Sequence, residues 1–210
     1  MASVTRKSPS GRAARRDELR GRLLGVVERL LGEGDTFTEI SVERMVAEAG
    51  IARSTFYVYF EDKGDLLEAW FGEITAELRT AAAEWWRLGP TPAYPELRAA
   101  LAAIVSTYRP HTTLMAAMYD TAAYDAGVRD LVTAMMDENV AGLRKHIRTG
   151  QRDGFVDPSL PAGETAQWLT WMAERGLHQL VRTANDAELE RLLDAYAGIV
   201  WNTLYAPVLV

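Results

Sequence analysis

Residues 38–67 read TEISVERMVAEAGIARSTFYVYFEDKGDLL, and this segment is the most informative part of the chain. It contains two short amphipathic stretches, 41–49 and 53–59, joined by an Ala-Gly-Ile turn. Ser41 is suited to cap the first stretch, and Gly50 is suited to end it. Two short helices that follow a longer helix and are joined through a glycine are typical of a helix-turn-helix. In that motif the second short helix lies in the major groove of DNA.

The two stretches divide into inward and outward faces. The first stretch has one apolar face, as a packed scaffold helix requires. This face consists of Val42, Met45, Val46 and Ala49. In the second stretch, the residues expected to anchor inward are Ile51, Phe56 and Phe60. The side chains left toward solvent are Arg53, Ser54, Thr55, Tyr57 and Tyr59. Hydroxyl groups and a guanidinium suit base edges and phosphates, although tyrosines are also common in protein cores.

Glycine and proline divide the rest of the chain into helical lengths, and no run alternates between β-branched and polar residues. The sequence therefore predicts an all-α fold of about nine helices. They are expected at 13–33, 41–49, 53–59, 62–86, 96–108, 111–124, 128–152, 164–183 and 187–204. The proline-dense stretch 88–95 ends the long fourth helix and is expected to mark a soft boundary.

Composition and charge narrow the class of protein. The chain has 210 residues and no cysteine, which excludes a disulfide framework, a thiolate zinc site and a cysteine nucleophile. No segment offers about 18 uncharged apolar residues in a row, so we expect a cytoplasmic protein with no membrane partner. The net charge is −6, but residues 1–60 carry ten basic and eight acidic residues and are therefore positive. Residues 1–16 hold five bases and no acid, which predicts either a DNA-contacting arm or a solvated leader.

The run Thr55-Phe-Tyr-Val-Tyr-Phe60, followed by Lys63-Gly-Asp-Leu-Leu67, resembles the signature of the TetR family of transcriptional repressors. The resemblance implies that Thr55, Tyr57 and Tyr59 contact bases or phosphate. It also implies that Ser41 and Lys63 hold the DNA backbone at the two edges of the groove, although Lys63 could also be an ordinary solvated side chain. The residues implied or expected to bind DNA are Ser41, Arg44, Arg53, Ser54, Thr55, Tyr57, Tyr59 and Lys63.

One position departs from the family pattern. Ala52 stands where the family usually has a serine that caps the recognition helix. Loss of a helix cap costs on the order of 1 kcal/mol, so we expect the second short helix to be firm only when it is docked on DNA.

The resemblance also implies a domain layout. A disordered basic arm is expected at 1–16, a three-helix DNA-binding domain with the helix-turn-helix at 17–62, and a helical effector-binding and dimerisation domain at 63–210. A homodimer on a palindromic double-stranded operator, released by a hydrophobic small molecule, would follow. No cofactor is expected.

The C-terminal half resembles the branch of this family that includes the mycobacterial ethionamide-resistance repressor. The resemblance rests on Met172-Ala-Glu-Arg175, Arg152-Asp-Gly154 and Ile199-Val-Trp-Asn-Thr-Leu-Tyr205. It implies pairing of subunits through the last two helices. Because aromatic residues, methionine and arginine are enriched at interfaces, the expected dimer contacts are Trp168, Met172, Arg175 and Gln179. The alternative is that these helices only complete the core of a monomer.

Apolar residues repeat at helical spacing on two further helices and predict an elongated cavity between them. The residues expected to line it are Leu97, Leu101, Ile104, Tyr108, Val132, Met136, Asn139, Leu143, Thr170, Ala173, Leu177, His178 and Trp201. A solid core would show the same stripes. In the branch named above, two asparagines hold ligand carbonyls, but this chain has Thr170 and Ala173 at those positions, and Asn139 is the expected substitute.

No catalytic pattern is present in the sequence. His111, His146 and His178 are too scattered for a helical metal motif, and neither a P-loop nor a Gly-x-Ser-x-Gly elbow occurs. The sequence therefore predicts a regulator rather than an enzyme, and no metal site. The alternative function is a small-molecule sensor or carrier of the same fold that has lost DNA binding.

Overall fold

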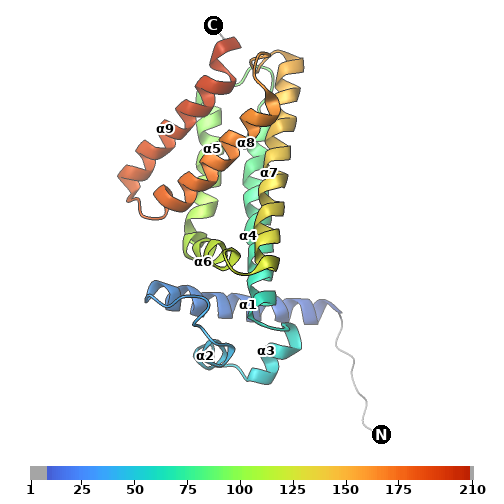
Figure 1. The fold of residues 1–210 in the computed structure, drawn as a ribbon, viewed down its shortest axis with the longest axis vertical. Coiled ribbons are helices and arrows are strands. Elements are labelled where there is room, and N and C mark those ends of the chain that lie inside the picture. Colours follow the sequence, from blue (N-terminus) through green and yellow to red (C-terminus); the bar gives the residue numbers. More distant parts are fainter. Residues whose placement is uncertain (1–8, 209–210) are drawn as a thin grey trace. The chain divides into compact units, whose positions relative to one another are not determined.

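The computed structural model describes residues 9–208, and this part of the chain is helical without a β-strand (Figure 1). The α-helices are α1 (Pro9–Gly32), α2 (Val42–Glu48), α3 (Arg53–Tyr59), α4 (Lys63–Trp86), α5 (Tyr94–Tyr108), α6 (Thr112–Ala122), α7 (Ala126–Asp153), α8 (Ala162–Gly176) and α9 (Asp186–Leu204). Three short helical turns complete the chain: η1 (Arg109–His111), η2 (Leu177–Val181) and η3 (Ala206–Val208). The all-α expectation is confirmed. Within residues 9–208 no helix combines the length and apolar character needed to cross a membrane.

Several helices begin earlier than expected, and the difference matters most for α1 and α5. Helix α1 starts at Pro9, so residues 9–16 of the expected disordered arm are helical, while residues 1–8 lie outside the described part of the chain. Helix α5 starts at Tyr94, before Pro95. Proline is tolerated in the first turn of a helix because its missing N–H has no helical partner there. The backbone N–H of Ala93 donates to Glu96 Oε2 at 3.2 Å, which completes this helix start.

The prediction of a single α-helix at 164–183 was wrong. Helix α8 ends at Gly176 and is followed by the π-helical turn η2. A π turn takes more residues per turn than an α-helix, so side chains beyond it point in directions that an α-helical count does not predict. This change of register affects the placement of His178 and Gln179.

The chain divides into two compact units, and the division falls between Gly72 and Glu73, within α4. This lies beyond the expected boundary at 62/63. The reason is that the start of α4 completes the core of the first unit: Leu66, Leu67 and Trp70 are buried there. The indole Nε1 of Trp70 donates to the carbonyl of Arg20 in α1 at 3.1 Å.

The first unit is built on α1, with α2 and α3 on one side of it (Figure 1). Its core is formed by apolar side chains spaced at three and four residues on α1, with partners from α2, α3 and the start of α4. Among the fully buried members are Leu23, Val27, Ile40, Met45, Phe56 and Leu66. This core fixes which faces of the two short helices remain outside.

The second unit packs long helices side by side, with the short α6 across one end (Figure 1). Its core joins Trp85, Leu101, Ile147, Val200 and Tyr205, among others. Gly150 lies where no side chain fits, because a Cβ built there would be 2.3 Å from Cγ2 of Val156. The close approach lets the Gly150 carbonyl accept hydrogen bonds from the backbone of Phe155 and Val156 at 2.9 and 3.2 Å, which closes the end of α7.

Candidate functional site

Helices α2 and α3 are joined by a tight turn whose geometry depends on Gly50. This residue has φ +61°, in the left-handed region that favours glycine. The N–H of Gly50 donates to the carbonyl of Ala47 at 3.1 Å, and the N–H of Ile51 donates to that of Val46 at 2.9 Å. This pair of bonds is a Schellman motif, which satisfies the carbonyls that a helix end leaves unpaired. The expected helix-turn-helix is therefore present, with α3 as its second helix.

The start of α2 is capped as the sequence predicts, and the start of α3 is not. The Ser41 hydroxyl accepts a hydrogen bond from the N–H of Arg44 at 3.1 Å. Ala52, at the corresponding position before α3, has no side-chain cap. The uncapped α3 rests instead on its buried Phe56 and on the fully buried Phe60 that follows it.

The outer face of α3 carries the side chains that the sequence predicts for DNA. Arg53, Ser54, Thr55 and Tyr57 are exposed, and Tyr59 is half-buried. The Tyr57 ring is 46% exposed, although one edge rests on Phe56 at a centroid distance of 5.3 Å. The exposed part of Tyr57 is therefore accessible to a binding partner.

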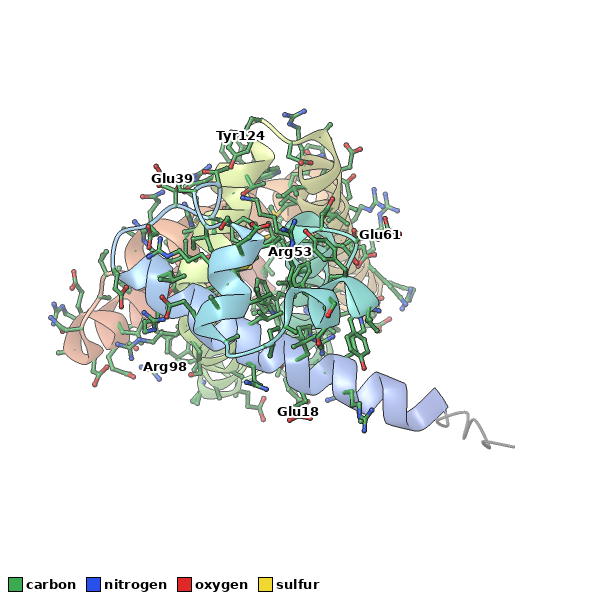
Figure 2. All side chains as sticks on the ribbon, turned by 90° about the horizontal axis from the view of Figure 1, so that it is seen from below. Glu18, Glu39, Arg53, Glu61, Arg98 and Tyr124 are labelled. Carbon is green, nitrogen blue, oxygen red and sulfur yellow. The ribbon has the colours of Figure 1, made fainter. Side chains whose placement is uncertain are left out.

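Two arginines expected at DNA are paired with acids in the free protein. Arg44 binds Asp35 through two nitrogens at 2.9 and 2.8 Å. Arg53, labelled in Figure 2, lies 2.8 Å from Glu43 and 5.5 Å from the centre of the Tyr57 ring. Because exposed ion pairs contribute at most about 1 kcal/mol, phosphates can replace these acids at little cost.

Lys63 has a different environment from the one expected. Its ammonium group donates to the carbonyls of Phe37, Thr38 and Ile40 at 3.0, 2.7 and 3.3 Å. Burial lowers the pKa of this amine. All three of its donors are used to hold the loop before α2, so a phosphate contact would require one of these bonds to be exchanged.

A cavity of about 110 Å³ lies in the second unit, lined by residues of α4, α5, α6, α7, α8, η2 and α9. Of the thirteen residues expected to bind a ligand, eight line it: Ile104, Tyr108, Met136, Asn139, Leu143, Thr170, Ala173 and Leu177. Asn139 lines the cavity and is also exposed, so the cavity reaches the surface near it. Its enclosed volume is below the roughly 150 Å³ of an engineered cavity that accepts benzene, so a larger ligand would have to extend through the opening near Asn139.

Five expected residues do not line this cavity. Leu97 and Leu101 are fully buried in the core, and Trp201 packs against Tyr94 and Tyr205 at 5.7 and 5.5 Å between ring centres. Val132 and His178 are half-buried outside the lining. The His178 ring instead meets the edge of Tyr119 at 4.9 Å. Helical periodicity identifies an inward face but not which neighbour that face meets.

Sequence reasoning missed the contributions of α4 and α6 and a buried acid on α8. The additional lining residues are Leu78, Ala82, Trp85, Trp86, Met115, Tyr119, Met135, Leu169, Glu174 and Tyr196. The apolar pair Trp85-Trp86 was visible in the sequence. Its inward direction could not be assigned without the packing of α4 against α7.

The four residues expected at a dimer interface lie on α8 or in η2. Trp168 is 78% exposed, Arg175 and Gln179 are exposed, and Met172 is half-buried. Three other large apolar side chains are exposed: Trp171 on α8, Leu180 in η2 and Ile199 on α9. A further apolar cavity, of about 170 Å³, lies among α5, α8, η2 and α9, with Leu180 and Ile199 in its lining. Exposed apolar surface of this kind is typical of an interaction face.

The histidines occupy three separate environments. His111 lies 3.4 Å from Glu77, His146 is buried in the core, and His178 contacts Tyr119. Within residues 9–208 no group of three potential metal ligands comes together.

Comparison with known proteins agrees with this geometry. Residues 29–70 match the family described as bacterial regulatory proteins, tetR family, and residues 97–206 match the C-terminal domain of the transcriptional regulator EthR. The regulator EthR of Mycobacterium tuberculosis (strain CDC 1551 / Oshkosh) is 28% identical over 94% of this chain and 93% of its own length. EthR of Mycolicibacterium smegmatis is 25% identical over 83% of this chain and 81% of its own length.

A solved structure has the same fold. Salmonella enterica GusR superposes with a TM-score of 0.70 and 16% identity, covering 89% of this chain and 95% of that protein. The fold and the helix-turn-helix define a class of DNA-binding transcriptional regulators. The chain belongs to the TetR family, with a C-terminal domain of the EthR type. The relatives named above are HTH-type transcriptional regulators.

Proposed function

We propose that this regulator is a homodimeric repressor that a hydrophobic small molecule releases from a palindromic operator. The observation that carries the proposal is the outer face of α3, where an exposed Tyr57 stands beside Arg53, Ser54 and Thr55. The inner face of α3 is fixed by Phe56. A rigid short helix with hydroxyl, aromatic and guanidinium groups outside is suited to a major groove.

Phosphate contacts on either side of the groove would add affinity. Arg44 and Arg53 would exchange Asp35 and Glu43 for phosphates, and each exchange releases counterions from the DNA. Operator affinity should therefore fall with salt. Replacement of Arg53 with alanine should reduce the slope of that dependence by about one.

Dimerisation through α8 and α9 would cover the exposed Trp168, Trp171 and Ile199. A two-fold axis between the subunits places the same reading surface on two half-sites of a palindrome. The half-sites would be separated by about 34 to 36 Å, one turn of DNA, or by a related distance.

Release would act through α4. This helix starts at Lys63 in the first unit and supplies Leu78, Ala82, Trp85 and Trp86 to the cavity in the second. A ligand that fills the cavity would change the tilt of α4 and so increase the distance between the helix-turn-helix motifs of the two subunits. For this to happen the ligand must bind the separated state more tightly, because equal affinity for both states shifts nothing.

The alternative function is a sensor of the same fold without DNA binding. Footprinting of the purified protein on the DNA that flanks its own gene distinguishes the two. Protection of a palindrome, lost on addition of a cavity ligand, supports the repressor. A folded dimer that protects no sequence there or in a pool of random duplexes supports the sensor.

A further inference from the structure

An acidic side chain lies inside the cavity without a full set of partners. Glu174 on α8 lines the cavity and is only 8% exposed. Its Oε2 atom is buried and accepts no hydrogen bond. The nearest paired base, Arg175, places its Nε 3.8 Å from Oε2, which is too long for a hydrogen bond, and the Arg175 side chain is 65% exposed. A buried carboxylate in this state is costly to the protein unless a partner arrives.

Two tyrosines, Tyr108 and Tyr119, line the same cavity as this acid. The Tyr108 ring at the end of α5 is only 3% exposed, and its hydroxyl group has no hydrogen-bond partner. Burial and then the charge of Glu174 raise the pKa of Tyr108. Burial and then the charge of Glu174 also raise the pKa of Tyr119 on α6. The three side chains therefore form one polar cluster, which leaves an unpaired carboxylate oxygen and an unpaired hydroxyl.

No base on the neighbouring elements completes the cluster. Arg182, whose charge acts on Tyr108, is exposed beyond η2. Burial lowers the pKa of His178, which touches Tyr119, so at neutral pH this imidazole supplies no cation. Among the described residues the cluster thus has an acceptor for a positive charge but no buried cation of its own.

The remainder of the cavity is apolar and aromatic. Trp85 and Trp86 stack at 4.9 Å between ring centres at the end of α4, and Met115, Met136 and Leu143 add to the lining. Two members of the polar cluster come from the last residue of α5 and from α6, which lies at one end of the second unit (Figure 1). The two indoles are on the last turn of α4, toward the opposite end of that unit (Figure 1). A ligand that fits both ends has a polar head and a hydrocarbon or aromatic body.

We propose that the effector is a hydrophobic amine, whose ammonium group binds Glu174 Oε2 and the Tyr108 hydroxyl while its apolar body lies against Met136 and Trp86. The inference rests on the proposed function, since it names the chemical class of the effector. A ligand that offers only a carbonyl or a carboxylate can accept a hydrogen bond from the Tyr108 hydroxyl but brings a second acceptor to Glu174 Oε2 and leaves that oxygen unpaired. An ammonium group brings donors and a charge that satisfy both open positions.

The test measures ligand binding to the full chain without DNA. Isothermal titration at neutral pH compares phenylbutylamine with phenylbutanol and phenylbutyrate, which have the same apolar body. The amine should bind about ten- to hundredfold more tightly than the alcohol, the range of a hydrogen bond to a charged group. Glu174→Gln should bring the two within about threefold of each other. The matched control Glu164→Gln, an exposed acid on the same helix, should keep the preference.

A second variant keeps the test decisive if Glu174→Gln does not fold. Tyr108→Phe retains the acid and should weaken amine binding by about ten- to hundredfold, the range of a hydrogen bond to a charged group. Equal affinity for amine and alcohol in the wild type, no amine binding, an unchanged preference in Glu174→Gln, or an unchanged amine affinity in Tyr108→Phe would each overturn the inference.

Failure of the inference and failure of the proposed function give different results. Operator binding without a preference for amines would contradict only the effector class. Amine binding that depends on Glu174 in a protein that binds no DNA would support the amine site and contradict the repressor.

Discussion

The hydroxyl group of Tyr205 lies 2.8 Å from Nε2 of His146 in the core of the second unit. Nε1 of Trp85 donates to the same hydroxyl oxygen, also at 2.8 Å. Because an indole N–H can only donate, the Tyr205 oxygen accepts from Trp85, and its own proton can be donated to a neutral His146 imidazole. Burial lowers the pKa of His146 to about 4, although a hydrogen bond with the Trp86 backbone opposes the shift.

The neutral state of His146 predicts a loss of stability in mild acid. Between its ordinary pKa of 6.5 and the folded value of about 4, the unfolded chain binds a proton that the folded chain excludes. The free energy of unfolding should therefore be fully retained above pH 6.5 and fall by about 3 kcal/mol as the pH drops through this window. Urea unfolding at a series of pH values measures the slope. His146→Gln, which does not titrate, should flatten it; identical slopes in the two proteins would refute the assignment.

Removal of the Tyr205 hydroxyl should destabilise the second unit. Tyr205→Phe leaves Trp85 Nε1 and His146 Nε2 buried without a partner, at a cost of about 2 to 5 kcal/mol in the free energy of unfolding. The matched control is Tyr124→Phe, because this ring is 61% exposed and should cost less than about 0.5 kcal/mol. Thermal unfolding of both variants checks the difference, and equal melting temperatures would argue against the buried network.

Two glycine substitutions in the first unit should have opposite effects. Gly50→Ala forces a side chain into the left-handed conformation of the α2–α3 turn and should destabilise the protein by about 1 to 2 kcal/mol, although its Cβ would meet only Arg22 Nη2, at an ordinary contact distance of 3.8 Å. Gly25→Ala, on the exposed side of α1 with nothing within 4 Å, should stabilise it by about 0.5 to 1 kcal/mol. Urea unfolding followed by circular dichroism measures both. A stabilising Gly50→Ala would contradict the role given to this turn.

The helix-turn-helix was predictable from the sequence because its signals are local. Ser41 caps α2, Gly50 closes it, and α3 covers the expected residues 53–59. Each of these features depends on a few neighbouring residues, so no knowledge of distant packing was needed. The environment of Lys63 was less predictable, because its acceptors belong to a loop some 25 residues earlier in the chain.

The cavity was only partly predictable because its walls come from helices distant in sequence. Met136, Asn139 and Leu143 repeat at helical spacing and do line it. Leu97 and Leu101 show the same pattern but are buried in the core, since periodicity does not identify the partner helix. Glu174 gave no signal either, because acids on amphipathic helices are usually solvated.

A bulky side chain at Ala173 should alter the response to effectors. Ala173 lines both apolar cavities, so Ala173→Trp should fill the space that a ligand needs. Operator binding should persist while the ligand concentration needed for release shifts or the release is lost. The control Ala141→Trp, at an exposed position on α7, should respond as the wild type does. A normal dose-response in Ala173→Trp, with the dimer intact by light scattering, would count against this site.

The central claim is that the outer face of α3 reads DNA, and Tyr57→Ala tests it most directly. Fluorescence anisotropy with a labelled duplex from the footprinted region measures affinity, beside Tyr124→Ala as a second exposed tyrosine outside the helix-turn-helix. Because Tyr57 is 46% exposed, its loss should leave folding and dimerisation unchanged. We predict that Tyr57→Ala loses operator binding and that Tyr124→Ala binds as the wild type does. Near-native affinity of the Tyr57→Ala dimer for the operator would contradict the account.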